Sequence, residues 1–272
     1  MKSILKFAAV AILGGIILTS CHKDKNDIPQ KVEKKVTFDQ MENPDNPYDE
    51  QGKIHNEFLD YTAEAIDISS TKEMTSKETL DLVKRFYASK QMDFDARQMK
   101  AYEELFNNYA ESGIGNDGGV SALKSRWCEY FPGLCDVLRT CLPTILLSKT
   151  NGGTSTGRTL KFIDSVKQVE RKILSDKNYT DKERKGLLSL TSVARFSAGY
   201  WHNVDKFEKG NSPYYKSIQA LAASDCPTCD VVMGDAVGAG IGSMIPGVGT
   251  GVGAGIGSLA VATVKFIRWL WD

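Results

Sequence analysis

Residues 162–174 read Phe-Ile-Asp-Ser-Val-Lys-Gln-Val-Glu-Arg-Lys-Ile-Leu, and this stretch decides the fold class. Its apolar residues recur every three or four positions, which places them on one face of an α-helix. Charged and polar residues fill the positions between them. The pattern predicts an amphipathic helix whose apolar face lies in a protein core.

The same helical period continues on both sides of this stretch. Two Thr-x-x-Glu pairs, Thr75 with Glu78 and Thr180 with Glu183, have the spacing of capping boxes at helix starts. Strand-like alternation is almost absent. The sequence therefore predicts an all-α bundle of about seven helices over residues 51–230. The apolar stripes on which this rests are 54–66, 80–87, 99–109, 134–147 (interrupted by Pro143), 162–174, 187–204 and 214–221.

A loop with two glycines, residues 151–155, marks a candidate subdivision of this domain near residue 150. Residues 21–50 differ in composition, since they carry many charges, three prolines and few large apolar side chains. Such a segment buries too little apolar surface to fold by itself. We expect it to be a disordered, flexible tether.

The C-terminal segment is rich in glycine. Residues 234–257 contain ten of the 24 glycines and one charged residue, Asp235. A four-residue spacing stacks glycines along one helix face, so that another backbone can approach closely, as helices do in lipid. Three series have this spacing: Gly234, Gly238 and Gly242; Gly247, Gly251 and Gly255; and Gly249, Gly253 and Gly257.

The chain then ends in cations and tryptophans, which are typical of a membrane–water boundary: Lys265, Arg268, Trp269 and Trp271. We predict that residues 231–272 form a glycine-rich helical hairpin that turns near Pro246 and interacts with a membrane. Its first limb, 231–243, is too short to span and would be re-entrant, whereas 248–267 is long enough. Glycine at every second position of 247–257 also fits a flat strand, and a glycine linker is the third alternative.

The N-terminus has the pattern of an export signal. Lys2 and Lys6 precede an apolar run, 7–18, that is too short to span a membrane. The run ends in Leu18-Thr19-Ser20-Cys21, which resembles the lipobox of bacterial lipoproteins. That resemblance implies that residues 1–20 are a lipoprotein signal peptide and that Cys21 is acylated, with palmitate among the acyl chains. An ordinary signal peptide followed by a chance cysteine is the alternative.

Five cysteines follow Cys21, an odd number in a chain expected to reach an oxidising compartment. Two disulfides and one spare thiol are the default, and the sequence does not fix the pairing. The C-x-x-C pair lacks the βαβ setting of a redox motif and the further ligands of a zinc site. The candidates for disulfides are Cys128, Cys135, Cys226 and Cys229.

Charge and motifs argue against several functions. Without residues 1–20, 32 basic and 34 acidic residues remain, which does not suit a nucleic-acid binder. No phosphate-binding glycine motif is present. His55 and His202 fit buried histidines bonded by neighbouring Asn or Asp, or a shared polar site between two helices. Without a nucleophile–base pair or metal spacing, we expect neither an enzyme nor a cofactor or metal.

Two segments, 46–61 (Asn-Pro-Tyr-Asp, then His-Asn-Glu-Phe-Leu-Asp-Tyr) and 194–201 (Ala-Arg-Phe-Ser-Ala-Gly-Tyr-Trp), resemble uncharacterised lipoproteins from Bacteroidota. The C-terminal segment is similar to glycine-zipper membrane segments and to bacteriocins. These resemblances imply a cell-envelope protein, lipid-anchored in the cell or outer membrane and facing the periplasm or the cell surface. We expect its partners to be membrane lipid and further copies of the tail. A toxin-like membrane activity and a surface or periplasmic binding or structural role, with the tail as second anchor, are both open.

Overall fold

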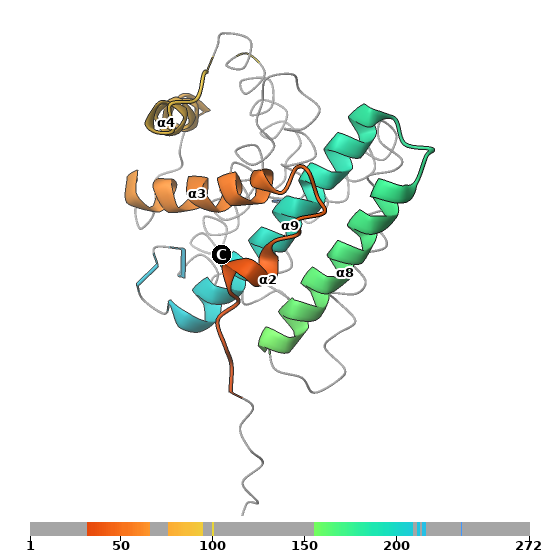
Figure 1. The fold of residues 1–272 in the computed structure, drawn as a ribbon. Coiled ribbons are helices and arrows are strands. Elements are labelled where there is room, and N and C mark those ends of the chain that lie inside the picture. The colour runs from red at the N-terminus through yellow and green to blue at the C-terminus, as the bar shows by residue number, and fades with distance from the viewer. Residues whose placement is uncertain are drawn as a thin grey trace, which may run out of the picture. The chain divides into compact units, whose positions relative to one another are not determined.

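The computed structural model describes residues 32–65, 76–94, 100, 155–208, 211–212, 214–215 and 235. Every regular element in these ranges is a helix, so the all-α prediction is confirmed for this part of the chain (Figure 1). The predicted total of about seven helices and the predicted C-terminal hairpin involve residues that the structure does not describe. Both therefore stay predictions. The described helices are α2 (Phe38–Met41), α3 (Glu50–Ala65), α4 (Ser76–Ser89), α8 (Ser155–Ser175) and α9 (Asp181–Phe207).

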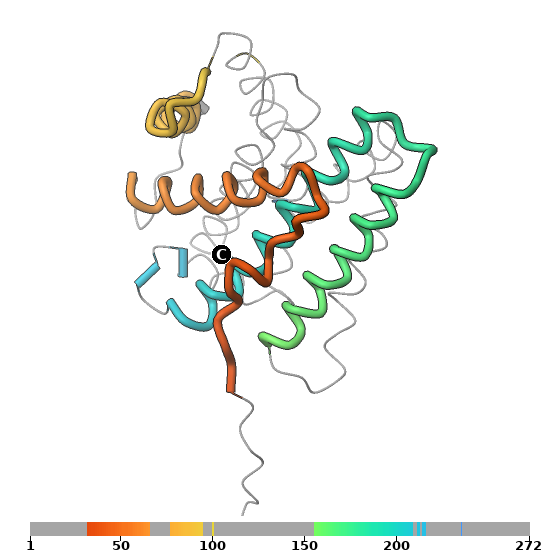
Figure 2. The backbone as a smooth tube through the Cα atoms, in the orientation of Figure 1, coloured from red at the N-terminus to blue at the C-terminus, as the bar shows by residue number. Residues whose placement is uncertain are grey.

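Helices α8 and α9 form an antiparallel pair joined by a short turn (Figure 2). The predicted apolar face of α8 is buried in the core, with Phe162, Ile163, Val166 and Ile173 almost inaccessible to solvent. Asp176 stabilises the turn by accepting from the backbone N–H of Asn178 at 2.9 Å. The periodic stretch that predicted the fold class therefore contributes to the core as expected.

Helix α9 begins at the predicted capping box. The hydroxyl of Thr180 accepts from the backbone N–H of Glu183 at 3.2 Å, and the Glu183 carboxylate accepts from the backbone N–H of Thr180 at 2.9 Å. Because each side chain satisfies a backbone donor that the helix leaves unpaired, the helix start is well defined. In the second predicted capping box, Thr75 lies outside the described ranges, so this box stays a prediction.

Helix α9 is the central element of the described structure. Helices α3 and α8 both make their main contacts with it (Figure 1). From Leu187 to Val204 it is buried on nearly all sides. A helix covered in this way needs small residues where its neighbours approach closely. The buried part of α9 is rich in small residues: Ser189, Ser192, Ala194, Ser197, Ala198 and Gly199.

The contact of α3 with α9 depends on Gly52. A Cβ atom at this position would lie 2.3 Å from Cδ2 of the Phe196 ring and 2.8 Å from the backbone oxygen of Ser192. Farther along α3, Phe58 packs edge-to-face on Phe86 of α4 at 5.1 Å between ring centroids. Phe86 thus links α4 to the predicted apolar stripe of α3.

Residues 33–49, which we call the N-terminal strap, lie against α8 and α9. The strap buries Val36 and Met41 in the core, and its backbone at Val36 exchanges hydrogen bonds with the side-chain amide of Asn203. The folded unit accordingly begins at Glu33, whereas the sequence placed the boundary after a flexible tether of residues 21–50. A few well-placed apolar residues and many hydrogen bonds hold a segment whose average composition is too polar to predict burial.

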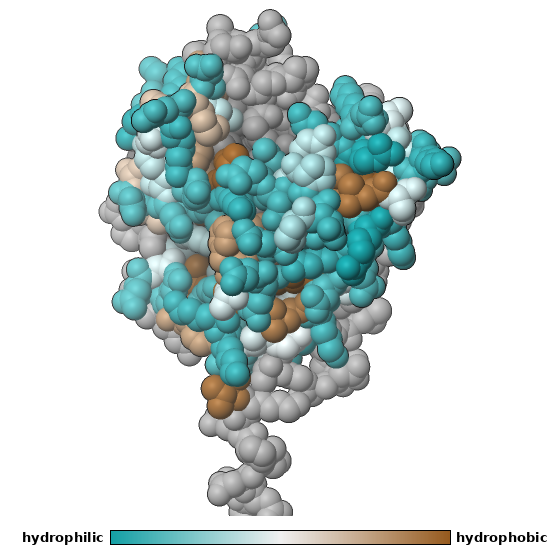
Figure 3. Space-filling model, viewed as in Figure 1, coloured by the Kyte–Doolittle hydropathy of each residue, from teal (hydrophilic) through white to brown (hydrophobic). Residues whose placement is uncertain are grey.

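The visible surface over α3, α8 and the strap is mostly hydrophilic (Figure 3). Among the described residues, the large apolar side chains that remain exposed are Val32 and Phe38. No helix in the described part of the chain is both long enough and apolar enough to cross a membrane.

Candidate functional site

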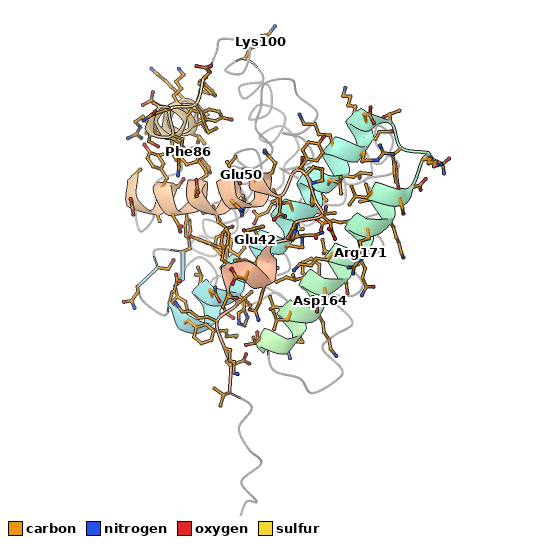
Figure 4. All side chains as sticks on the ribbon, in the orientation of Figure 1. Glu42, Glu50, Phe86, Lys100, Asp164 and Arg171 are labelled. Atoms are coloured by element: carbon orange, nitrogen blue, oxygen red, sulfur yellow. The ribbon has the colours of Figure 1, made fainter. Side chains whose placement is uncertain are left out.

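The first buried polar network joins α8 to α9 through Glu170 and Arg195. Both side chains are fully buried, and Arg195 donates to Glu170 Oε1 from Nε at 3.2 Å and from Nη2 at 3.0 Å. By contrast, Asp164 and Arg171, labelled on α8 in Figure 4, are exposed. A buried ion pair holds its geometry only when hydrogen bonds satisfy the remaining oxygens and N–H groups.

The strap supplies those hydrogen bonds to Glu170. Asn43 donates from Nδ2 to Oε2 at 2.7 Å, and Asn46 donates from Nδ2 to Oε1 at 2.7 Å. Asn46 also donates to the backbone oxygen of Leu188 at 2.8 Å. The carboxylate of Asp49 accepts from Nη2 of Arg195. The network therefore fixes strap, α8 and α9 to one another.

Arg195 Nη1 is buried and has no hydrogen-bond acceptor among the described residues. Lys167 approaches the same region and donates from Nζ to the backbone oxygen of Gln40 at 2.9 Å. Partial burial, together with the positive charge of Arg195, lowers the pKa of Lys167. The carboxylates of Asp164, Glu170 and Asp49 act in the opposite direction and raise this pKa.

The second network surrounds Asp235, the one described residue of the glycine-rich segment. Its side chain is fully buried. Its Oδ2 accepts from Ser197 Oγ at 2.5 Å and from Trp201 Nε1 at 2.9 Å, both on α9. The same oxygen lies 3.3 Å from Nε2 of His55 on α3. Three side chains from two helices therefore converge on one carboxylate oxygen.

His55 bridges this carboxylate to a second acceptor. Its Nδ1 lies 2.8 Å from Oδ1 of Asn56, whose Nδ2 donates to the backbone oxygen of Phe196 at 3.4 Å. His55 thus connects Asp235 to the Asn56 side chain and, through it, to the backbone of α9. The interpretation of His55 as a buried histidine bonded by neighbouring Asn and Asp side chains is confirmed.

Serine, histidine and aspartate meet here, but not in the geometry of a hydrolytic triad. In a triad the histidine lies between the nucleophile and the carboxylate. Here Ser197 donates directly to Asp235, and His55 approaches the same oxygen from α3. All three side chains are fully buried.

A third cluster fixes the start of the strap on α8. The Glu33 carboxylate accepts from the backbone N–H groups of Ser155 and Thr156, each at 2.8 Å. Burial raises the pKa of Glu33, but the hydrogen bonds from Thr156 and Ser155 outweigh it, so the pKa lies below its usual value. A carboxylate at this position also suits the positive end of the helix dipole.

His202 lies beside the same cluster, with Nε2 at 3.1 Å from the backbone oxygen of Lys34. Burial lowers its pKa, although that hydrogen bond and the charge of Glu33 act in the opposite direction. His202 is separate from the Asp235 network, so the two histidines do not share a polar site. Within the described ranges no group of His, Cys, Asp and Glu side chains could hold a metal ion.

The remaining candidate residues of the sequence lie outside the described part of the chain. They are Cys21; Cys128, Cys135, Cys226 and Cys229; the glycine series Gly234, Gly238, Gly242, Gly247, Gly249, Gly251, Gly253, Gly255 and Gly257; and Lys265, Arg268, Trp269 and Trp271.

Sequence reasoning missed the Glu170–Arg195 network, although one signal was present. Glu170 follows Val166 by four positions and precedes Ile173 by three, which places a carboxylate on the apolar face of α8. A charge at such a position is expected to have a buried partner. The strap also contains two Asn-Pro pairs, at residues 43–44 and 46–47. They were a weaker indication of a buried network, because their spacing does not show which helix the asparagines contact.

Comparison with known proteins adds no relative: no family model, curated protein or solved structure matches the chain at a significant level.

Proposed function

We propose that this chain is a cell-envelope lipoprotein, anchored by acyl chains on Cys21, whose glycine-rich tail inserts or self-associates in a membrane. The helical body is the water-exposed part and holds the root of the tail. The polar surface over α3, α8 and the strap supports a body that lies outside the bilayer (Figure 3). The lipobox resemblance and the glycine series supply the two membrane contacts.

The observation that carries the proposal is the burial of Asp235. It is the one charged residue between Gly234 and Gly257, and its carboxylate bonds to the body. Residues 236–264, which follow it, contain no Asp, Glu, Lys or Arg. As a helix, 29 residues would extend about 43 Å, more than the ~30 Å of a hydrocarbon core. We therefore place the start of the membrane segment after Asp235 rather than at Val231.

The glycine spacing supports close packing of helices within this segment. In an isolated helix each glycine costs about 1 kcal/mol relative to alanine, so ten glycines do not favour a single helix in water. Close approach of a second helix face offsets that cost, as small-residue faces do in lipid. A hairpin turning near Pro246, or association between copies, provides such a face.

A test replaces Gly251 and Gly255 together with leucine. We expect the double variant to lose self-association in detergent, as measured by sedimentation equilibrium, although the segment becomes more hydrophobic. The matched control replaces Val252 and Ile256 with leucine, which leaves every glycine in place and should leave association unchanged. If the double glycine variant associates as strongly as the control variant, the glycines are not a packing face. The tail would then be a second anchor of a surface or periplasmic binding or structural lipoprotein.

A further inference from the structure

We propose that the outer surface of the α8–α9 hairpin lies on anionic phospholipid headgroups and thereby orients the helical body on the membrane. This deepens the proposed function and rests on its lipid anchor at Cys21. Two observations support it: an excess of exposed cations on this hairpin, and the attachment of the N-terminal strap to the same helix, α8. We call this surface the basic ridge, and its cations are Lys161, Arg171, Lys172, Lys177 and Lys182.

The fold uses the carboxylates of the hairpin but leaves these cations free. Asp176 and Glu183 each accept from a backbone N–H group, at the turn and at the start of α9. Asp181 pairs with Arg184 at 3.2 Å, and Glu170 is buried in its ion pair with α9. Within the described ranges, no carboxylate lies at ion-pair distance from any of the five exposed cations of the ridge. Their charge is therefore available to a partner.

The ridge concentrates a charge that the chain as a whole lacks. Residues 155–185 contain nine basic and five acidic residues, although the full sequence has 34 of each. Lys161 and Lys172 are eleven positions apart, which is about three helical turns, so they lie on one face of α8. Arg171 adjoins this face, and Asp164 is the one exposed carboxylate of α8. The outer side of α8 is therefore predominantly cationic.

Helix α3 has the opposite charge, and α9 lies between it and α8 (Figure 1). The ionisable side chains of α3, apart from those of histidine and tyrosine, are four carboxylates and one lysine: Glu50, Glu57, Asp60, Glu64 and Lys53. An anionic surface attracts the basic ridge and repels α3. Charge complementarity therefore selects the α8 side of the body as the side that faces anionic lipid.

The proposed anchor keeps this side of the body near the bilayer. Glu33, where the folded unit begins, bonds to the first turn of α8 through Ser155 and Thr156. The chain from Cys21 to Glu33 is twelve residue steps long and extends at most about 40 Å. Helix α8 is about 32 Å long, so its whole length can lie on the surface. Near an anionic leaflet each cation changes the population of an orientation about fivefold, and several together favour one orientation strongly.

The test is lysine-selective acetylation of the full acylated chain on vesicles, with mass spectrometry of each site. On vesicles that contain phosphatidylglycerol, the reactivity of Lys177 and Lys182 should be at least about fivefold lower than on vesicles of phosphatidylcholine. The internal control is Lys77 of α4, which is exposed and whose reactivity should not change. The protection should disappear in about 1 M salt, where the Debye length is only about 3 Å.

A triple variant tests the charge of α8 itself: Lys161→Glu, Arg171→Glu and Lys172→Glu, all at exposed positions. It leaves Lys177 and Lys182 as reporters, and their reactivity should then be the same on both kinds of vesicle.

The matched control variant carries three substitutions on α4: Lys77→Glu, Lys84→Glu and Arg85→Glu. It changes the net charge of the chain by the same amount, away from the ridge. This control should retain the protection of Lys177 and Lys182 on vesicles that contain phosphatidylglycerol.

Two results would overturn the proposal. One is equal reactivity of Lys177 and Lys182 on the two kinds of vesicle in the wild type, which would mean that the ridge does not face the bilayer. The other is protection that appears without vesicles and grows with protein concentration, which would assign the ridge to the acidic α3 of a second copy. The wild-type comparison needs no substitution, so it decides even if the triple variant does not fold. Attachment to phosphatidylcholine vesicles is measured separately, because its loss would contradict the lipid anchor and not the ridge.

Discussion

Arg195 of α9 and Glu170 of α8 form an ion pair in the core, with 3.0 Å between Nη2 and Oε1 and neither side chain exposed. From the strap, Asn43 and Asn46 donate hydrogen bonds to Glu170, and Asp49 accepts one from Arg195. Asp49 and Arg195 are 146 positions apart in the sequence, and the structure brings them together. The pair is therefore the junction on which the strap and both long helices depend.

Glu170→Ala should destabilise the protein strongly. It leaves the Arg195 guanidinium buried beside a single carboxylate, and removing one partner of a buried pair costs about 3–5 kcal/mol. Urea unfolding followed by circular dichroism gives the free energy of unfolding. Asp81→Ala is the control, since its partner Arg85 is exposed and 4.0 Å away, and it should change that free energy by less than about 1 kcal/mol. A loss below about 1 kcal/mol for Glu170→Ala would contradict the role given to the pair.

Gly52→Ala and Gly199→Ala should differ although both add one methyl group to a buried helix. At Gly52 the new Cβ meets the backbone oxygen of Ser192 at 2.8 Å, which cannot move alone. At Gly199 it meets the flexible side chain of Met41 at 2.2 Å. We expect a loss of about 1–3 kcal/mol for Gly52→Ala and a smaller one for Gly199→Ala, measured by chemical unfolding. The opposite order would show that the α3–α9 contact is looser than described.

Burial lowers the pKa of His202 below its usual value of 6.5, so the unfolded chain binds a proton more readily than the folded chain. The resulting stability is complete above pH 6.5 and is lost as the pH falls through that value towards the folded pKa. The free energy of unfolding should therefore decrease on acidification from pH 7.5 to 5, and His202→Gln should show a smaller decrease. Glu33, Asp205 and Lys206 also face His202 and are kept unchanged in this comparison. If the free energy of unfolding depends on pH identically in the wild type and in His202→Gln, His202 is not the cause of the decrease.

Periodicity and capping chemistry were sufficient to predict α8 and α9. Their apolar residues repeat over several turns, and Thr180 with Glu183 marks one start by a local rule. The strap could not be found in this way, because its burial depends on Glu170, more than a hundred positions later in the chain. The role of Asp235 was hidden for the same reason. Its partners His55, Ser197 and Trp201 come from two helices, and no local pattern connects them.

The cysteines after Cys21 give a test of export. If the chain reaches an oxidising compartment, at most one of the five should react with a thiol reagent in unreduced protein. Mass spectrometry after alkylation counts the labelled sites. Three or more reactive cysteines would contradict the disulfide interpretation and would restore a metal or redox role for Cys226 and Cys229.

Val252→Asp tests most directly whether the segment after Asp235 inserts into a bilayer, as we propose. A charge near the middle of residues 236–264 costs about 2.5–3.5 kcal/mol in a bilayer and little in water. Quenching of tryptophan fluorescence by brominated lipid chains should therefore fall sharply in Val252→Asp, whereas Asn26→Asp, in the segment expected to be a tether, should leave it unchanged. Quenching in Val252→Asp equal to that of the wild type would show that the segment does not enter the bilayer.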